Sequence, residues 1–382
     1  MKRLIFLLIL GSAVISVAQN FPIGHQSLSL TDPNRSNRSI DLELYYPAVA
    51  PGNNQGFAVG AFPLVSFGHG FQMTYDVYAP IYDSLASRGY VVANLKTEGS
   101  FSPSHTDFGK DLAFVVDYFF AQNLNASSPY FDKLNGKSAM GGHSMGGGAS
   151  LLAAQYTSNE TCIFNFAAAE TNPSAIAQCS TSVTEPLLVI AGSYDLVAPP
   201  STNQEPMYNA ALSGCKFLVN LTGGYHCRFS DQSFTCEFGE GVLGAPTDGI
   251  SRDQQLNRTR AILHPWLDFW LKEIPEAWNQ FSGVVAAGQG FTSISNCTQS
   301  LVNNQIGSIE IYPNPGKNRF VVETSNLISS MEMFDETGRV VGRFKLNGKR
   351  TEIEDLHLSP GLYFIKLNGI EKPFKWVVCE GE

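Results

Sequence analysis

The segment 138–150 constrains this chain more than any other, because it contains the pattern Gly142-His143-Ser144-Met145-Gly146. In a G-x-S-x-G pattern, the serine stands on a sharp turn between a strand and a helix, and the turn lifts its hydroxyl above the sheet edge. The flanking glycines keep side chains out of this turn. The alternative is a glycine-rich turn that happens to contain serine. A strand ending near position 140 and a helix over 149–156 favour a nucleophile at Ser144.

Short apolar runs alternate with helical patterns on both sides of this segment. Strands are expected at 62–67, 90–95, 162–168, 187–191 and 216–221, and helices at 81–87, 107–121 and 258–272. This alternation predicts an α/β fold with a doubly wound, mostly parallel sheet covered on both faces. Two alternating segments near the N-terminus, 27–30 and 40–46, predict antiparallel edge strands. Pro265 is expected to kink or divide the last helix.

A serine nucleophile needs a general base, and the base needs a carboxylate that orients it. Asp195 and His226 both follow Ser144 in the chain, each in a loop directly after a predicted strand. The carboxyl ends of parallel strands share one edge of a sheet, so the order Ser, Asp, His predicts that the three meet there. His105 is the rival base. The alternative roles are a turn-capping aspartate at Asp195 and a surface histidine at His226.

The reaction also requires hydrogen-bond donors for a developing oxyanion. The Met145 N–H, at the start of the elbow helix, is one candidate. The flexible turn 68–71, after a predicted strand, supplies the second through the Phe71 N–H. With these donors, Ser144 is expected to attack a carbonyl and His226 to take its proton, which gives an acyl-enzyme without any metal or cofactor.

The N-terminus and the overall charge bound the location and the partners of the chain. Lys2 and Arg3 precede the apolar run 4–10, and small residues end at Ala18, which predicts a secretory signal over 1–18. The alternative, a membrane anchor, requires a longer apolar run, and no other segment is suited to a stable membrane span. The formal net charge of −9 offers no basic surface for nucleic acid.

Seven cysteines in an exported chain permit disulfides. Cys162 with Cys179 and Cys227 with Cys236 are close enough in sequence to form pairs. The connectivity stays open, and the odd number leaves at least one cysteine unpaired.

The last quarter of the chain has a different character. The expected catalytic domain covers 19–282, and 283–307 is rich in Gly, Ser, Asn and Gln without a clear period, which suits a linker. From 308 to 382, short alternating runs are separated by turns. This pattern predicts a small all-β sandwich domain.

The motifs of the larger domain resemble a known group of enzymes. The elbow, the turn 68–71 and the segments 193–199 and 223–227 make 62–271 similar to the polyester hydrolase (PETase) and cutinase-like branch of the α/β-hydrolases, near the dienelactone-hydrolase-like esterases. The resemblance implies a secreted serine carboxylic ester hydrolase. Polyesters such as PET, lipids and short-chain esters are the candidate substrates.

The same resemblance implies an acyl cleft lined by Phe71, Met145 and Val197. Ser174 stands where those enzymes carry a tryptophan that stacks on aromatic substrates. The segment 228–253 is longer than their loop after the histidine, which makes it either part of a lid or a decorative insertion.

Residues 308–382 resemble the C-terminal sorting domain of type IX secretion. The motifs lie at 311–315, 335–339 and 358–364. The resemblance implies a bacterium of the Bacteroidetes type, export through the periplasm to the cell surface or medium, and the type IX machinery as partner. The alternative for this domain is a carbohydrate- or polymer-binding sandwich.

Two other functions for the whole chain stay open at this point. One is a non-catalytic binding protein with the hydrolase fold, and the other is a serine peptidase, because the same triad serves both reactions. Turnover of a p-nitrophenyl ester separates an enzyme from a binding protein, and release from esters but not amides separates an esterase from a peptidase.

Overall fold

The computed structural model describes residues 20–297, 309–324, 328, 330–346, 348–354, 356–367 and 373–379. The signal expected at 1–18 lies outside these residues. Within the described part, no helix combines the length and the apolar character that a membrane span requires.

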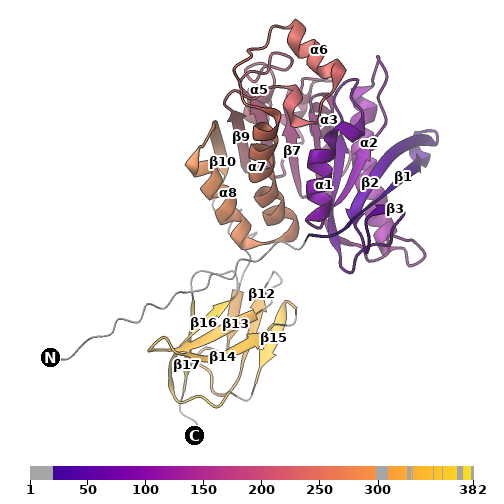
Figure 1. Ribbon diagram of the computed structural model, residues 1–382. Helices are drawn as coiled ribbons and strands as arrows, with labels where there is room; N and C mark the ends of the chain where they lie inside the picture. The colour runs from indigo at the N-terminus through magenta and orange to yellow at the C-terminus, as the bar shows by residue number, and fades with distance from the viewer. Residues whose placement is uncertain are drawn as a thin grey trace, which may run out of the picture.

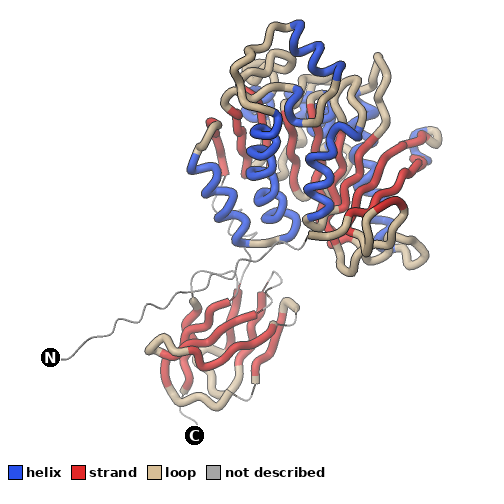
Figure 2. Tube along the Cα trace, in the orientation of Figure 1, coloured by secondary structure: helices blue, strands red, loops and turns tan. Residues whose placement is uncertain are grey.

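A ten-stranded sheet forms the centre of the larger domain (Figures 1 and 2). Its strands are β1 (Ile23–Asp32), β2 (Arg38–Pro47), β3 (Gly52–Asn53), β4 (Phe62–Gly68), β5 (Val91–Leu95), β6 (Leu134–His143), β7 (Cys162–Phe166), β8 (Leu187–Gly192), β9 (Cys215–Leu221) and β10 (Phe291–Cys297). They lie in the order β10-β9-β8-β7-β6-β4-β5-β2-β1-β3. The pairs from β5 through β9 are parallel, whereas β1, β2 and β10 pair antiparallel at the two sides.

Helices cover both faces of this sheet, which confirms the predicted doubly wound α/β fold. One face carries α2 (His105–Leu124), α3 (Met145–Ala153), α4 (Ala175–Cys179) and α5 (Gln204–Ala210), and the other carries α1 (Ala79–Ser87), α7 (Arg252–Lys272) and α8 (Pro275–Ala287). Side chains of one strand alternate between the two faces. In β4, Leu64 packs into the core beneath α2 and α3, while Val65 and Phe67 pack into the core beneath α1 and α7.

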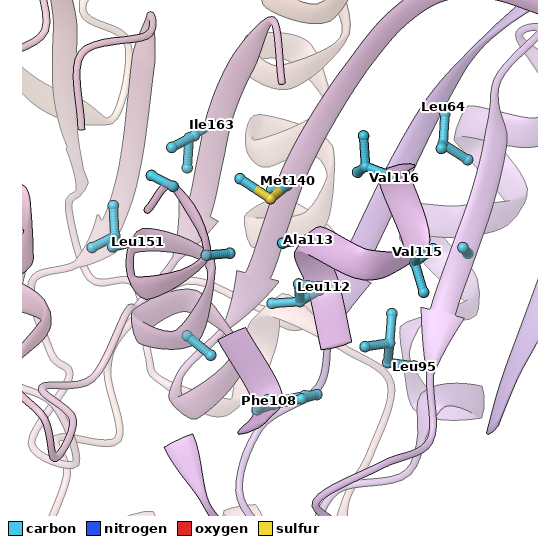
Figure 3. Close-up of a cluster of buried hydrophobic side chains, with 14 of the residues drawn as sticks. Leu64, Leu95, Phe108, Leu112, Ala113, Val115, Val116, Met140, Leu151 and Ile163 are labelled. Carbon is cyan, nitrogen blue, oxygen red and sulfur yellow. The ribbon is translucent and has the colours of Figure 1, made fainter. Parts of the chain in front are cut away.

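The longest helix of the first face shows why these residues form a helix. Ser104 caps α2 by accepting a hydrogen bond from the Asp107 N–H at 3.2 Å. The predicted apolar stripe of α2 is buried, and Figure 3 shows Phe108 and Leu112 directed into the cluster that includes Met140 of β6. Burial of such side chains contributes about 1.5–3 kcal/mol each.

Two boundaries differ from the sequence prediction. The first half of the expected linker is structured, because α8 runs to Ala287 and β10 pairs with β9 along its whole length. Helix α7 is a single helix through Pro265, so the predicted division does not occur.

Two disulfides join residues of the larger domain, Cys227–Cys236 as expected and Cys215–Cys297. The predicted pair Cys162–Cys179 is wrong. Cys162 lies in the core beneath α7 and Cys179 in the core on the other face of the sheet, so the sheet separates their thiols. Burial raises the pKa of both thiols.

The smaller domain is an all-β unit of two antiparallel sheets. One contains β11 (Ile309–Tyr312), β12 (Phe320–Thr324) and β15 (Arg350–Ile353), and the other contains β13 (Ser330–Asp335), β14 (Val340–Lys345), β16 (Gly361–Leu367) and β17 (Phe374–Val378). Residues of both sheets, such as Phe320, Met333 and Trp376, share one core. The predicted small β domain is therefore present.

Two of its motif turns have clear physical roles. Asp335 accepts hydrogen bonds from the Thr337 hydroxyl and N–H and from Arg339, which lowers the pKa of Asp335 to about 2. Asn314 donates to the Lys375 carbonyl and accepts from the Val377 N–H, so it fastens the first turn to β17.

The Cys215–Cys297 bridge yields a stability prediction. It links residues 82 apart in sequence and fastens the edge strand β10 to β9. In the chain-entropy model, Cys297→Ser lowers the free energy of unfolding by about 4 kcal/mol. Urea denaturation without reductant measures this loss, and Cys379→Ser, at an unpaired exposed cysteine, is the control. Equal midpoints for Cys297→Ser and Cys379→Ser contradict the prediction.

Candidate active site

The elbow predicted from the sequence lies between β6 and α3. Ser144 has φ 54° and ψ −118°, a conformation that non-glycine residues rarely adopt. Three backbone hydrogen bonds hold it. The Ser144 N–H donates to the Phe166 carbonyl at 3.0 Å, and the Ser144 carbonyl accepts from the N–H groups of Gly148 and Ala169 at 3.0 and 2.9 Å. The strained turn thereby fixes the direction of the Ser144 hydroxyl.

Glycine at position 146 permits a close backbone contact between the elbow and the loop after β4. The Gly146 N–H donates to the His69 carbonyl at 3.0 Å. A Cβ atom on Gly146 would lie 2.2 Å from the Gly68 oxygen, far inside contact distance. A side chain at position 146 would therefore push the two segments apart.

The structure brings Ser144, His226 and Asp195 together in one hydrogen-bonded row. Nε2 of His226 lies 2.9 Å from the Ser144 Oγ, and its Nδ1 lies 2.7 Å from Oδ2 of Asp195. The other carboxylate oxygen accepts the N–H groups of Val197 and Ala198, at 2.9 and 2.7 Å. All three members of the row are buried. With the proton on Nδ1, His226 donates to Asp195 and leaves Nε2 free to accept the serine proton.

Two backbone N–H groups in the segments joined at Gly146 have no partner among the described residues. Among the described residues, neither the Met145 nor the Phe71 N–H donates a hydrogen bond. Met145 is the first residue of α3, where N–H groups have no partner within the helix. Gln72 holds the neighbouring loop by donating to the Gly99 carbonyl at 2.9 Å. The arrangement can therefore offer two donors to an oxyanion.

Side chains from three elements hold the backbone around His226. The His226 N–H donates to Oε1 of Glu240 at 2.7 Å, and its carbonyl accepts from Nε2 of His143 at 2.9 Å. Gln255 of α7 bonds both the N–H and the carbonyl of Tyr225, at 2.8 and 2.7 Å. Glu240 belongs to α6 (Phe234–Val242), inside the long segment 228–253. The sequence signalled only the extra length of this segment.

His143 connects the histidine loop to the loop after β4. Burial lowers the pKa of His143 well below its usual value, so the ring is neutral and carries one proton. With Nε2 donating to the His226 carbonyl, Nδ1 accepts from the Tyr78 hydroxyl at 2.8 Å. The Tyr78 oxygen in turn accepts from the Gly70 N–H at 2.9 Å. The ring thus acts as a spacer between the two loops.

Other predicted site residues lie at the same sheet edge with different environments. Phe71 and Val197 are exposed, whereas Met145 is buried. Ser174 is the N-cap of α4, and its hydroxyl accepts from the Ala177 N–H at 3.0 Å. This half-buried serine offers no stacking surface in place of a tryptophan.

His105, the rival base, lies at the first position of α2. Its Nδ1 accepts from the Asn172 N–H at 3.0 Å, and the hydrogen bonds of the Ser144 row do not include it.

A serine at a strand-to-helix elbow, on a doubly wound sheet, defines an α/β-hydrolase. Residues 42–239 match the family described as PET hydrolase-like, and the chain belongs to this family. Residues 310–377 match the secretion system C-terminal sorting domain, so the chain carries a type IX sorting domain and is exported.

Several curated proteins are similar to the larger domain. Cutinase est1 of Thermobifida alba is 29% identical over 186 residues, which are 48% of this chain and 56% of that protein. Cutinase 2 of Thermobifida cellulosilytica is 29% identical over 48% of this chain and 64% of its own length. Bis(hydroxyethyl) terephthalate hydrolase of Streptomyces coelicolor is 28% identical over 44% of this chain and 48% of its own length. The chain thus spans about half the length of the curated relatives it matches.

The contact between Glu240 and His226 yields a kinetic prediction. Glu240→Ala leaves a buried N–H of the histidine loop unpaired, a loss of about 1–3 kcal/mol. We expect kcat on a soluble ester to fall by about tenfold to a hundredfold, with little change in KM. Glu240→Gln keeps an acceptor oxygen at this place and retains most of kcat. Steady-state kinetics of the two variants measure the difference. Equal losses in both variants contradict a positioning role for the acceptor.

Proposed function

We propose that this protein is a secreted serine carboxylic ester hydrolase, with Ser144 as nucleophile, His226 as general base and Asp195 as the residue that orients it. The observation that carries this proposal is the row of hydrogen bonds of 2.9 and 2.7 Å that joins the three side chains. The order of the three residues along the chain and the membership in the PET hydrolase-like family support the same function.

The first half of the reaction forms an acyl-enzyme. Ser144 Oγ attacks the ester carbonyl carbon while Nε2 of His226 takes the hydroxyl proton. Asp195 stabilises the resulting imidazolium through Nδ1. The N–H groups of Met145 and Phe71 stabilise the oxyanion of the tetrahedral intermediate, and each such donor typically contributes a factor of about 10²–10³ to the rate.

His226 then passes its proton to the leaving alkoxide oxygen and the C–O bond of the substrate breaks, which completes the acyl-enzyme. The second half of the reaction regenerates the enzyme. A water molecule then gives a proton to His226 and attacks the acyl group on Ser144. Collapse of the second intermediate returns the proton to Ser144 and releases the carboxylic acid.

The proposed substrates are uncharged esters, including polyesters. The names of the relatives, cutinases and a bis(hydroxyethyl) terephthalate hydrolase, describe activities on such esters. Phe71 and Val197 are exposed apolar residues beside the site, and they suit an apolar acyl group. Because Ser174 replaces an aromatic stacking residue, we expect weaker selection for aromatic acyl groups.

The fold and the sequence together support a proposal for the domain limits. We assign the catalytic unit to 19–297, after removal of the signal 1–18, since β10 completes the sheet. The sorting unit covers 308–382 and supplies the contact with the type IX machinery. These limits are the ones to use for truncated chains.

Substitutions in the hydrogen-bonded row test the catalytic assignment. Ser144→Ala removes the nucleophile and should lower kcat on p-nitrophenyl acetate by about 10⁶. Asp195→Asn should lower it by about 10⁴, because the histidine loses the partner that fixes its tautomer. Circular dichroism checks that both variants are folded.

The matched control is His105→Ala, at the rival histidine. It should keep kcat within about threefold of the parent, a change of less than about 1 kcal/mol. A Ser144→Ala variant that keeps near-normal turnover, or a loss confined to His105→Ala, contradicts the assignment. A panel of esters of increasing chain length and a polyester film then defines the substrate class.

A further inference from the structure

Helix α6 presents to solvent an apolar stripe that no other described residue covers. Phe234, Phe238 and Val242 are 85%, 64% and 70% exposed. They are spaced four residues apart, so they lie on one face of the helix. The rings of Phe234 and Phe238 stack on each other with centroids 6.0 Å apart. Exposed aromatic groups of this kind on one element mark a contact surface rather than a chance distribution.

The opposite face of α6 is fastened to the catalytic domain. Cys236 forms a disulfide with Cys227, directly after His226. Glu237 forms an ion pair with Arg252 of α7, and Glu240 accepts from the His226 N–H. The space beneath the helix is lined by polar side chains, including Arg252, Glu237 and Glu240. These anchors determine which face of α6 points outward.

The sequence of α6 indicates that the anchors, and not local propensity, maintain the helix. Gly239 and Gly241 lie inside it, and a Cβ atom on either would meet nothing within 4 Å. Two glycines cost a helix about 1 kcal/mol each relative to alanine. The Cys227–Cys236 disulfide and the Glu240 contact therefore hold the helix, and with it the outward side of the stripe.

The stripe lies at the same edge of the sheet as the nucleophile. Segment 228–253 follows the carboxyl end of β9, and Figure 1 shows α6 at the top of the view, beyond the start of α7. Phe71, Phe101 and Leu196 are also exposed, and each stands in a loop after the carboxyl end of a parallel strand. The stripe, these residues and the proposed active site therefore lie at the same edge of the sheet.

We propose that the stripe Phe234/Phe238/Val242 docks on the surface of a water-insoluble, uncharged ester, such as a polyester, and holds it at the site. This inference rests on the proposed function. A dissolved small ester cannot contact Ser144 and the outer face of α6 together, whereas an extended surface can. The two carboxylates of α6 point away from the stripe, and the net charge of −9 disfavours an anionic surface.

The test measures adsorption separately from catalysis. Phe234→Ser/Phe238→Ser/Val242→Ser is built in the Ser144→Ala background, and binding isotherms are recorded on poly(ethylene terephthalate) film and on cellulose film. Val59→Ser/Leu124→Ser is the matched control, because both residues are highly exposed and stand near the amino ends of β4 and β6. Circular dichroism verifies the folding of every variant.

The stripe variant should adsorb to the polyester film at least about tenfold more weakly than its parent, since burial of one phenylalanine accounts for about that factor. The control variant should adsorb like the parent, and neither should bind cellulose. When the same substitutions are made with Ser144 intact, the ratio of film hydrolysis to soluble-ester hydrolysis should fall by a similar factor for the stripe variant alone.

Several outcomes overturn the docking proposal. One is equal adsorption of the stripe variant and the parent to the polyester film. Another is a control variant whose adsorption is weakened as much as that of the stripe variant. A third is a dimer in light scattering that the stripe variant abolishes without any change in adsorption, because the stripe then contacts a second copy of the chain. If the protein with Ser144 intact hydrolyses no ester, the proposed function fails. The adsorption isotherms of the Ser144→Ala variants still decide the docking proposal.

Discussion

The contact between the backbones at Gly68 and Gly146 is the constraint on which the proposed active site depends. A Cβ atom at position 146 would lie 2.2 Å from the Gly68 oxygen, and the Gly146 N–H instead bonds the His69 carbonyl. This contact holds the start of α3 against the loop that carries Phe71. The contact therefore keeps the segments of Ser144, Met145 and Phe71 together before any substrate arrives, as the proposed stabilisation of an oxyanion requires.

The histidine loop is held by a different device, a set of buried polar side chains. Glu240 bonds the His226 N–H, His143 bonds its carbonyl, and Gln255 bonds Tyr225 twice. Buried backbone groups require partners, and loops usually obtain them from water. Here the partners come from β6, α6 and α7, so displacement of the His226 backbone requires several hydrogen bonds to break together.

Local sequence patterns predicted where the elbow and the loops of Asp195 and His226 lie on the sheet. The elbow and the loops of Asp195 and His226 each follow a short apolar strand, and parallel strands align their carboxyl ends by topology. The contacts of Glu240 and Gln255, and the Cys215–Cys297 bridge, join residues 14 to 82 positions apart and depend on tertiary packing. The wrong pairing of Cys162 with Cys179 arose because proximity in sequence does not reveal which face of a sheet a residue occupies.

Helix α6 shows why one insertion can affect both substrate capture and catalysis. Its inner face supplies Glu240 to His226, and the Cys227–Cys236 disulfide follows that histidine by one residue. Its outer face carries the exposed stripe. A surface bound to the stripe would therefore act on a helix whose other face holds the His226 backbone. The disulfide and the Glu237–Arg252 ion pair are the further contacts that fasten this helix to the catalytic domain.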